Sequence, residues 1–408
     1  MGATMNDTPH TKSLADGPLA GVRVVELGQL IAGPFCGQLM GDMGAEVIKV
    51  EAPGEGDPMR VWGRGAFPLW WEIVSRNKKS VSADLRQAEG QDLVRRLIAK
   101  ADILIENFRP GTLEKWNLSP EMLMRDNPGL IIVRVSGYGQ TGPYADRPGF
   151  GGVGEAMGGW RYLVGEQESP PARVGVSIGD TLAATYGCIG ALAALRARDL
   201  TGKGQIVDSA LYEAVLQVME SLIPEYTVAD YVRERSGAIL PGIAPSNVYH
   251  CKNGDYMIAA NQNSIFTRLC QAMGRPELAQ DARYATHVAR GERQTELDEL
   301  IGLWTRGLTV EEVEALMLEA KVPGGRIYRA ADMLVDPHFK AREAIIELEH
   351  PRWGKVHMQN VFPKLSDTPG AVRTIAPQAV GEHNREVYGQ LLGLEDAALD
   401  RLAETGIV

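Results

Sequence analysis

Short runs of β-branched residues alternate with helix-like segments through the first third of the chain, and this alternation limits the fold more than any other feature. Amphipathic or Gly-rich segments at 34–43 and 87–100 fall between the runs and favour helices. Strands separated by helices predict a parallel sheet covered on both faces. The sequence therefore predicts an α/β fold with a Rossmann-like large domain. The predicted strands are Val22–Leu27, Glu46–Glu51, Ser80–Leu85, Asp102–Asn107 and Leu130–Gly137.

The rest of the chain predicts a second, smaller unit. An Ala-rich run at 180–198 favours a buried helix, and 211–223 favours another. A Gly- and Pro-rich stretch at 232–245 marks a boundary. Beyond it, 247–260 predicts a hairpin with its turn at 253–255, followed by helices at 265–273, 291–306 and 310–320. We predict a disordered tail (1–17), the large domain (18–225), a linker (226–245), a small α+β domain (246–328), and a linker with a C-terminal segment (329–408).

Charge and composition narrow the class of partner. The formal net charge of -10 disfavours nucleic acid as a partner. Four scattered cysteines without a CxxC pair argue against a disulfide framework or a structural zinc site, and favour a reducing cytoplasm. The polar N-terminus lacks the apolar core of a signal peptide. Apolar stretches are interrupted before they reach about 18 residues, so no membrane span is expected.

Asp180 is the first candidate for chemistry. The sequence predicts that Gly179 ends a short strand at 173–178 and that Asp180 opens the long helix. A carboxylate there would accept N–H groups of the first turn and lie at the positive end of the helix dipole. Two interpretations remain open from this position alone. Asp180 could be an ordinary N-cap, or an ionised carboxylate aimed out of the helix to attack a thioester carbonyl.

Several polar and Gly-rich segments could bind a ligand. The segment 28–46 is Gly-rich but does not have the G-x-G-x-x-G spacing of a dinucleotide site. Basic clusters occur at 76–79 and 107–111, and both are expected at strand ends, where α/β folds bind ligands. They could contact phosphates, with Phe108 offered to an adenine ring. A solvated surface patch is the alternative for both clusters.

Other enzyme classes lack their motifs. His10 is the only histidine before His250, which argues against a Ser-His-Asp hydrolase in the α/β half, and no G-x-S-x-G elbow occurs. The sequence also lacks H-E-x-x-H, H-x-x-E-H and G-x-x-x-x-G-K-[ST], so a zinc peptidase and a P-loop NTPase are not expected.

Seven segments of the chain form a recognisable series. They are PLAGVRVVEL, AGPFCGQLMGDMGAEVIKVEAPGEGDPMR, NKKSVSADL, ENFRPGTLEKW, SGYGQTGPYADRPGF, VGVSIGD and TGKGQIVDSALYEAV. In this order they resemble the class III CoA-transferase family, which includes formyl-CoA transferase, carnitine CoA-transferase and α-methylacyl-CoA racemase. The resemblance runs from about Pro18 to Leu394. It implies an acyl-CoA substrate, no metal, and a homodimer of interlocked ring-shaped chains whose C-terminal stretch returns to the large domain.

The resemblance also implies roles for particular residues. It favours Asp180 as the catalytic nucleophile over Asp180 as a cap. The positions that it implies for contact with coenzyme A are Leu30, Ala32, Asn77, Lys78, Lys79, Asn107, Phe108, Arg109, Lys115, Ser136 and Gly137.

The sequence departs from the family pattern at several positions. Phe150 stands where the racemases carry a catalytic histidine, and Gly151 where the transferases carry an acid that Glu155 could replace. Ile31 replaces a glutamine of the oxalate-type members, and Asn261 and Gln262 stand in place of their glycine loop. We expect these residues near the substrate. Arg173 is expected to pair with the distal carboxylate of a dicarboxylic acid or to form a structural salt bridge.

These departures disfavour oxalate as acceptor. The segments LPGIAPSNVY and IFTRL resemble relatives that act on succinyl-CoA and C4–C5 dicarboxylic acids. The resemblance therefore implies succinyl-CoA as donor and a small dicarboxylic acid as acceptor, with CoA carried on Asp180 as an aspartyl thioester. Two other functions remain open. One is epimerisation of a 2-methylacyl-CoA, which the absence of histidine at Phe150 disfavours. The other is binding of acyl-CoA without catalysis.

Overall fold

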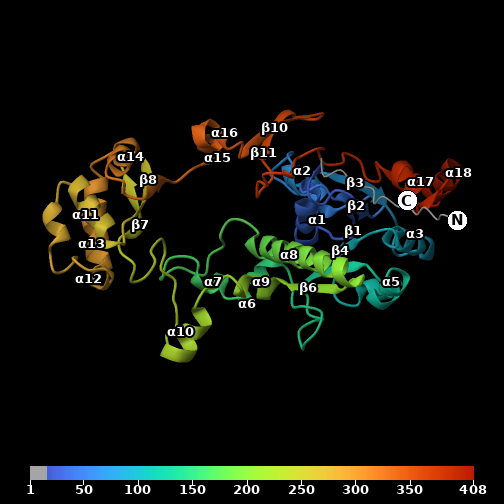
Figure 1. The fold of residues 1–408 in the computed structure, drawn as a ribbon, viewed down its shortest axis with the longest axis horizontal. Helices are drawn as coiled ribbons and strands as arrows, with labels where there is room; N and C mark the ends of the chain where they lie inside the picture. The colour runs from blue at the N-terminus through green and yellow to red at the C-terminus, as the bar shows by residue number, and fades with distance from the viewer. Residues whose placement is uncertain (1–15) are drawn as a thin grey trace, which may run out of the picture. The chain divides into compact units, whose positions relative to one another are not determined.

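The computed structural model describes residues 16–408, so most of the tail predicted at 1–17 lies outside the described residues. These residues form two compact units (Figure 1). The first contains 16–160, 174–221 and 343–408, and the second contains 161–173 and 222–342. The second unit therefore includes more of the chain than the small domain predicted at 246–328.

A six-stranded sheet forms the centre of the first unit. Its strand order is β3-β2-β1-β4-β5-β6, and every neighbouring pair is parallel. The prediction of an α/β fold with a parallel sheet is confirmed. Strands β2 and β3 are added on one side of β1, and strands β4 to β6 on the other side, so the strand order switches between β1 and β4. Ligands of open α/β sheets bind at the carboxyl ends of the strands that flank such a switch point. The strands are β1 (Arg23–Glu26), β2 (Glu46–Glu51), β3 (Lys78–Ser82), β4 (Ile103–Glu106), β5 (Ile131–Ser136) and β6 (Ile206–Ala210).

Helices cover both faces of this sheet. Val25, Leu104 and Ile132 point to one face and pack with helices α3 and α5, whereas Val24 and Ile103 point to the other face and pack with α1 and α8. Because both faces are buried, the strands are continuous apolar runs rather than alternating ones. The helices of this unit before the C-terminal segment are α1 (Ala32–Asp42), η2 (Pro58–Val61), α2 (Leu69–Val74), α3 (Ala88–Ile98), α4 (Thr112–Lys115), α5 (Pro120–Asp126), α6 (Gly151–Met157), α8 (Ile178–Thr201) and α9 (Leu211–Leu216), and α7 (Trp160–Leu163) lies where the chain enters the second unit.

Helix α8 is the longest helix among the described residues. Within them it is also the one helix long and apolar enough, by length and composition, to cross a membrane. Its small residues Ala183, Ala184, Ala191 and Ala194 are buried in the cluster that contains β5 and α1, as in the core helix of a soluble protein. The weak hydropathy signal is therefore explained by packing against the sheet.

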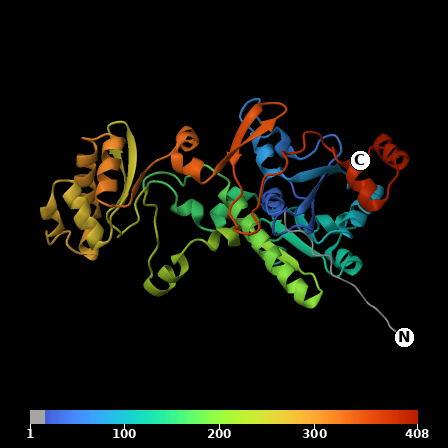
Figure 2. The same ribbon diagram turned by 45° about the horizontal axis from the view of Figure 1, so that its top comes forward.

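The C-terminal segment packs against the edge strand β3. The Asn384 carboxamide accepts a hydrogen bond from the Ser82 N–H at 2.8 Å, and the Tyr388 hydroxyl donates to the Ser82 carbonyl at 2.9 Å. Helix α17 also lies beside α3 (Figure 2). The elements of this segment are β10 (Ile345–His350), β11 (Gly354–Gln359), α17 (Asn384–Leu392) and α18 (Asp396–Glu404).

The second unit is built on a small antiparallel sheet, β7-β8-β9. The predicted hairpin is present, but Cys251 pairs with Gly254, so the turn is Lys252–Asn253 rather than 253–255. The predicted helix at 291–306 is interrupted at Arg293, which has a non-helical conformation. The elements are α10 (Leu222–Ala229), β7 (Ser246–Cys251), β8 (Gly254–Ala259), α11 (Asn263–Ala272), η3 (Pro276–Ala279), α12 (His287–Glu292), α13 (Gln294–Thr305), α14 (Val310–Glu319), β9 (Gly324–Arg326), α15 (Ala330–Val335) and α16 (Pro337–Ala341).

The predicted helix at 211–223 is also divided. It ends as α9 at Leu216, and α10 starts at Leu222. Glu220 between them has a φ of 53°, a left-handed conformation that a helix does not contain. The chain passes from the first unit to the second at this break, between Ser221 and Leu222.

Candidate active site

Asp180 lies in the first turn of α8. The helix starts at Ile178, and Ser177 is its N-cap without a side-chain capping hydrogen bond. The predicted strand at 173–178 is wrong, because residues 173–177 have no regular structure and Gly175 has a φ of 91°. The interpretation of Asp180 as the N-cap is also wrong, because Ser177 occupies that position and Asp180 is the third residue of the helix. Its carboxylate instead stands at the positive end of a helix of 24 residues, which favours the ionised form.

The Asp180 carboxylate lies directly over Gly151, the first residue of α6. A Cβ atom at position 151 would stand 2.1 Å from Asp180 Oδ2 and 2.7 Å from Cγ. A side chain at position 151 would therefore require the Asp180 carboxylate to move. Glu155, one turn further along α6, is buried, and its Oε1 accepts the N–H of Gly179 at 3.4 Å.

The turn between β1 and α1 carries three of the predicted contacts. Leu30 has a φ of 63°, and its N–H donates to Asp57 Oδ1 at 3.1 Å. Ile31 is buried in a small apolar cluster that includes Met59. Ala32 is the first residue of α1 and is also buried. These residues offer backbone rather than side-chain groups at the carboxyl end of β1.

A buried ionic network holds the turn between β1 and α1. Lys49 Nζ contacts Glu26 Oε1 at 3.1 Å and Asp57 Oδ2 at 2.8 Å, and donates to the Gly28 carbonyl at 2.7 Å. Burial lowers the pKa of Lys49, but the carboxylates of Asp57 and Glu26 outweigh that effect and raise it. Lys49 is therefore charged and holds the β1–α1 turn through Gly28 and Asp57.

The segment after β4 also lies at the carboxyl edge. The Asn107 carboxamide accepts from the Gln29 N–H at 2.8 Å and donates to the Gln29 carbonyl at 2.9 Å, which ties this segment to the β1–α1 turn. Phe108 is partly buried and packs edge-on against Trp116, with ring centres 5.0 Å apart. Arg109 and Lys115 are exposed on the same segment. Two cations and an aromatic ring are thus presented beside the turn.

The end of β4 is anchored by Glu106. This buried carboxylate accepts from Arg134 Nε at 2.7 Å and from the Phe108 N–H at 2.7 Å. Burial raises the pKa of Glu106 to about 7 even though Arg134 opposes the rise.

The last two predicted contacts follow β5. Ser136 is buried, and its hydroxyl accepts the Gly139 N–H at 3.0 Å. A Cβ at Gly137 would lie 3.0 Å from the Gly149 Cα. The end of β5 therefore adjoins the segment that leads to Gly151 and Asp180.

The cluster at Asn77–Lys79 does not lie with the others. Lys78 begins β3, so this cluster lies at the amino end of a strand, whereas α/β folds bind ligands at the carboxyl ends. The Lys78 amino group is buried and contacts Glu26 Oε2 and the Pro34 carbonyl, each at 2.7 Å. Asn77 bonds to Asp42 Oδ1 at 2.8 Å and to three groups of the C-terminal segment.

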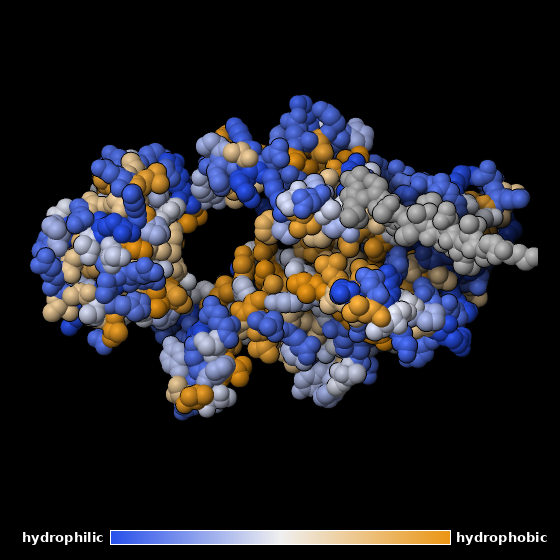
Figure 3. All heavy atoms as spheres, viewed as in Figure 1, coloured by the Kyte–Doolittle hydropathy of each residue, from blue (hydrophilic) through white to orange (hydrophobic). Residues whose placement is uncertain are grey.

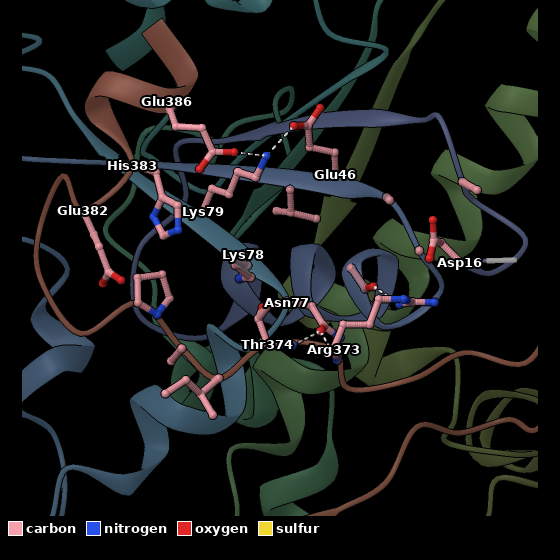
Figure 4. Close-up of a pocket in the computed structure, with 18 of the residues that line it drawn as sticks. Asp16, Glu46, Asn77, Lys78, Lys79, Arg373, Thr374, Glu382, His383 and Glu386 are labelled. Carbon is pink, nitrogen blue, oxygen red and sulfur yellow. Dashed lines mark hydrogen bonds and ion pairs between the residues drawn. The ribbon is translucent and has the colours of Figure 1, made fainter. Parts of the chain in front are cut away.

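A cavity of about 800 Å³ opens at this amino edge. Lys79 crosses it and contacts Glu46 at 2.9 Å and Glu386 at 2.8 Å (Figure 4). Burial lowers the pKa of Lys79, but these two carboxylates raise it overall. Lys79 thus links β2 to α17 through its two ion pairs. Carboxylates outnumber the Lys and Arg side chains among the residues that line the cavity.

The remaining predicted residues fall in different places. Phe150 is exposed at the N-cap position of α6. Arg173 is exposed in the part of the second unit at 161–173. Asn261 and Gln262 belong to the second unit, where they line a cavity of about 600 Å³ together with His287. Within residues 16–408, no three His, Cys, Asp or Glu side chains are grouped so as to hold a metal ion.

The buried Arg290 fixes the segment that contains Asn261. Its guanidinium donates to the carbonyls of Ala244, Tyr284 and Asn261 and to the Asn263 side chain, at 2.6–3.1 Å. Hydrogen bonds from Arg290 therefore hold the segment that contains Asn261 and Asn263 in place.

Sequence reasoning missed two residues at the carboxyl edge. Asp57, after β2, holds both Leu30 and Lys49. Arg86, after β3, is exposed and pairs with Asp84 at 2.8 Å. Arg86 could have been found as the first basic residue beyond a predicted strand, whereas Asp57 gives no such signal because its partners are distant in sequence.

Comparison with known proteins agrees with this geometry. CoA-transferase family III matches residues 19–384. A succinyl-CoA–D-citramalate CoA-transferase of Chloroflexus aurantiacus is 56% identical over 96% of this chain and 98% of its own. The beta subunit of a succinyl-CoA–L-malate CoA-transferase from the same organism is 41% identical, over 96% and 98%. A crystal structure of a CaiB/BaiF family protein from Brucella suis is similar with a TM-score of 0.82 and 35% identity, covering 92% of this chain and all of that one. The chain therefore belongs to CoA-transferase family III.

Proposed function

We propose that this enzyme transfers CoA from succinyl-CoA to a small dicarboxylic acid, with Asp180 as the covalent nucleophile. The observation that carries the proposal is the position of the Asp180 carboxylate in the first turn of α8, over a glycine and at the same edge as Asn107 and Arg109. A carboxylate at a helix start is ionised and surrounded by N–H donors, as a nucleophile for a thioester requires.

The steps conserve the activated acyl bond. Asp180 attacks the thioester carbonyl of the donor, forms an aspartyl–acyl anhydride and releases CoA as a thiolate. The thiolate attacks the aspartyl carbonyl, forms an aspartyl-CoA thioester and releases the donor acid. The acceptor carboxylate then attacks this thioester, which forms a second aspartyl–acyl anhydride and expels the CoA thiolate. The thiolate attacks the acceptor carbonyl of this anhydride, which forms the product thioester and releases the Asp180 carboxylate. N–H groups of the first turn of α8 can stabilise the oxyanions, each such donor being worth about 3–4 kcal/mol.

The CoA moiety is proposed to lie along the carboxyl edge. Backbone groups of Leu30 and Ala32, the Phe108 ring and the cations of Arg109 and Lys115 are the groups that suit it. Arg guanidinium and Lys ammonium groups are the usual partners of phosphates in proteins. The long-range field of a chain with net charge -10 repels such a ligand, so these local cations must supply the attraction.

The acceptor is proposed to be a hydroxylated C4–C5 dicarboxylate. The names of two similar relatives specify citramalate and malate, each with succinyl-CoA as donor. We further propose that Phe150, which belongs to the same unit as Asp180, helps to select this acid.

We also propose that the enzyme works in the cytoplasm as a homodimer, with the interlocked arrangement that its family resemblance implies. Support comes from large apolar side chains exposed along α8 and α9, where Ile189 is 54%, Leu200 70% and Leu216 40% exposed. Figure 3 shows hydrophobic side chains gathered over this region. Contiguous apolar surface of this kind marks a protein interface.

The test is turnover by purified protein of succinyl-CoA with citramalate, malate, glutarate and oxalate, with products identified by mass spectrometry. We expect the hydroxylated acids to give the highest kcat/KM. Hydroxylamine added during turnover should convert Asp180 to a hydroxamate. Transfer without any modification of Asp180 would contradict the mechanism, and deuterium exchange at the α-carbon without an acceptor acid would favour an epimerase.

A further inference from the structure

Glu155 is a buried carboxylate beside the first turn of α8, and no step of the proposed mechanism uses it. It is 1% exposed, and its Oε1 accepts the N–H of Gly179, the residue immediately before the proposed nucleophile, at 3.4 Å. A buried carboxylate is retained only where hydrogen bonds or charges compensate for its desolvation. The contact with Gly179 therefore points to a role at this helix start.

The helix that carries Glu155 is held rigidly. A Cβ atom at Gly154 would lie 2.6 Å from Leu211 Cβ, and one at Gly158 would lie 2.6 Å from Val215 Cβ. Helix α6 therefore packs on α9 at the closest distance that glycine allows. Because α6 cannot move without separating from α9, the carboxylate of Glu155 has a fixed position.

The first turn of α8 receives no cap from the side chain of its N-cap residue. Ser177 makes no side-chain capping hydrogen bond, and N–H groups in the first turn of a helix have no partner within the helix. Gly179 also has no side chain to restrict its backbone. An acceptor from another helix can therefore stabilise this turn, and Glu155 accepts the Gly179 N–H.

Gly179 fits tightly between the two helices. A Cβ on it would lie 2.9 Å from the Gly151 carbonyl oxygen and 3.2 Å from Glu155 Cγ. Glu155 thus holds one side of the residue that precedes Asp180, while Gly151 provides the surface under the Asp180 carboxylate. Any rotation of Gly179 would move that carboxylate off Gly151.

We infer that Glu155 is a positioning residue for Asp180: by accepting the Gly179 N–H it stabilises the first turn of α8 and fixes the direction of the nucleophile. This inference rests on the proposed function. What Glu155 supplies in this role is an acceptor oxygen beside Gly179. A displacement of about 1 Å at a reacting group can lower the rate about 10²-fold.

The experiment compares Glu155→Ala, Glu155→Gln and Glu155→Met with wild-type enzyme and with Val153→Ala, an exposed position on the same helix. The readouts are kcat, KM for succinyl-CoA, and the rate at which Asp180 is trapped as its hydroxamate. Glu155→Ala should lower kcat and the trapping rate about 10²-fold with KM within about twofold. Glu155→Gln keeps an oxygen acceptor and should recover to within about threefold, and Val153→Ala should match wild type.

Three results would overturn the inference. One is a wild-type trapping rate in Glu155→Ala. Another is a Glu155→Gln variant as slow as Glu155→Ala, which would mean that the charge rather than the acceptor matters. If Glu155→Ala unfolds below the assay temperature, Glu155→Met fills the volume without an acceptor, and wild-type kcat in this variant would refute the role. Wild-type enzyme that is never trapped would instead refute the proposed function, so the two failures are distinguishable.

Discussion

Two basic segments of this protein look equivalent in sequence and differ completely in structure. Asn77–Lys79 and Asn107–Arg109 each combine an asparagine with a cation next to a strand. The first lies at the start of β3, and its polar groups bond to Asp42, Glu26, Glu46 and the C-terminal segment. The second follows β4 and presents Arg109 to solvent.

The difference teaches that the end of the strand, rather than the composition of the cluster, decides what a basic segment does here. At the amino end of β3, Asn77, Lys78 and Lys79 are tied to neighbouring carboxylates and to the C-terminal segment. At the carboxyl end of β4, Arg109 is exposed and makes no such tie in the described structure. Variants at the two edges should therefore change different observables.

Removal of the nucleophile should produce the largest effect. We expect Asp180→Asn and Asp180→Ala to lower kcat by a factor of about 10³ or more, because no other group can carry the acyl and CoA moieties. Transfer between succinyl-CoA and the acceptor acid is measured, and circular dichroism checks the fold. Normal kcat in Asp180→Ala would show that the reaction does not depend on this carboxylate and does not take place at the carboxyl edge of the sheet.

A methyl group at Gly151 should produce the next largest effect. The added Cβ would stand 2.1 Å from Asp180 Oδ2, so the carboxylate has to move. We expect Gly151→Ala to lower kcat about 10–10²-fold with little change in KM, since positioning rather than binding is lost. Steady-state kinetics measure both parameters, and an unchanged kcat would mean that Asp180 reacts from another conformation.

The comparison of the two edges is tested directly by their cations. Arg109→Ala and Lys115→Ala should each raise KM for succinyl-CoA about tenfold, in keeping with a lost charge-assisted hydrogen bond of about 1.5 kcal/mol. Lys79→Ala is the matched control at the amino edge and should leave KM unchanged. A larger rise in KM for Lys79→Ala than for Arg109→Ala would mean that CoA binds at the amino edge rather than at the carboxyl edge.

Loss of Asn77 should affect stability without affecting binding. Its side chain makes four hydrogen bonds, to Asp42, Ala371, Arg373 and Thr374. We expect Asn77→Ala to lower Tm, with a cost of about 2–4 kcal/mol. Asn77 has a φ of 59°, which also strains an alanine at this position. Asn77→Gly removes the hydrogen bonds without this backbone strain, so the two variants together separate the two contributions to Tm. Normal Tm in both variants would refute the role of this residue as a tie.

The smallest expected effect is a change in pH dependence. Burial raises the pKa of Glu106 to about 7 in the folded protein, so the folded state binds this proton more tightly than the unfolded state. Its contribution to stability is therefore greatest below the unfolded pKa and declines by up to about 1.4 kcal/mol per pH unit as the pH rises towards 7. Tm measured from pH 5 to 7 should fall less steeply in Glu106→Gln than in wild type or in the exposed control Glu121→Gln. Equal slopes would contradict the assignment.

Much of the fold could be predicted from the sequence because its signals are local. The runs Glu46–Glu51 and Leu130–Gly137 are apolar and β-branched, and each forms a strand within one residue of the predicted bounds. The errors occur where apolar composition alone was used. The segment 173–178 looks like a strand but is irregular up to Ser177, since its exposed residues find no neighbouring strand.

The candidate site also has features that could be predicted from the sequence and features that could not. Motifs such as ENFRPG and VGVSIGD identify the family and mark Asp180, since reactive residues and their immediate neighbours are adjacent along the chain. The contact of Gly179 with Glu155 and the steric role of Gly151 could not be predicted, because they join helices that are separated in sequence.

The sequence by itself determined that strands and helices alternate, that Asp180 follows a glycine at a helix start, and that the family is that of the CoA-transferases. Only the tertiary structure decided which polar side chains lie exposed at the carboxyl edge of the sheet and which form internal contacts between distant segments. The physical reason is that alternation and helix starts depend on neighbours along the chain, whereas the exposure of Arg109 and the burial of Lys78 depend on which end of the sheet each strand presents and on what packs against it.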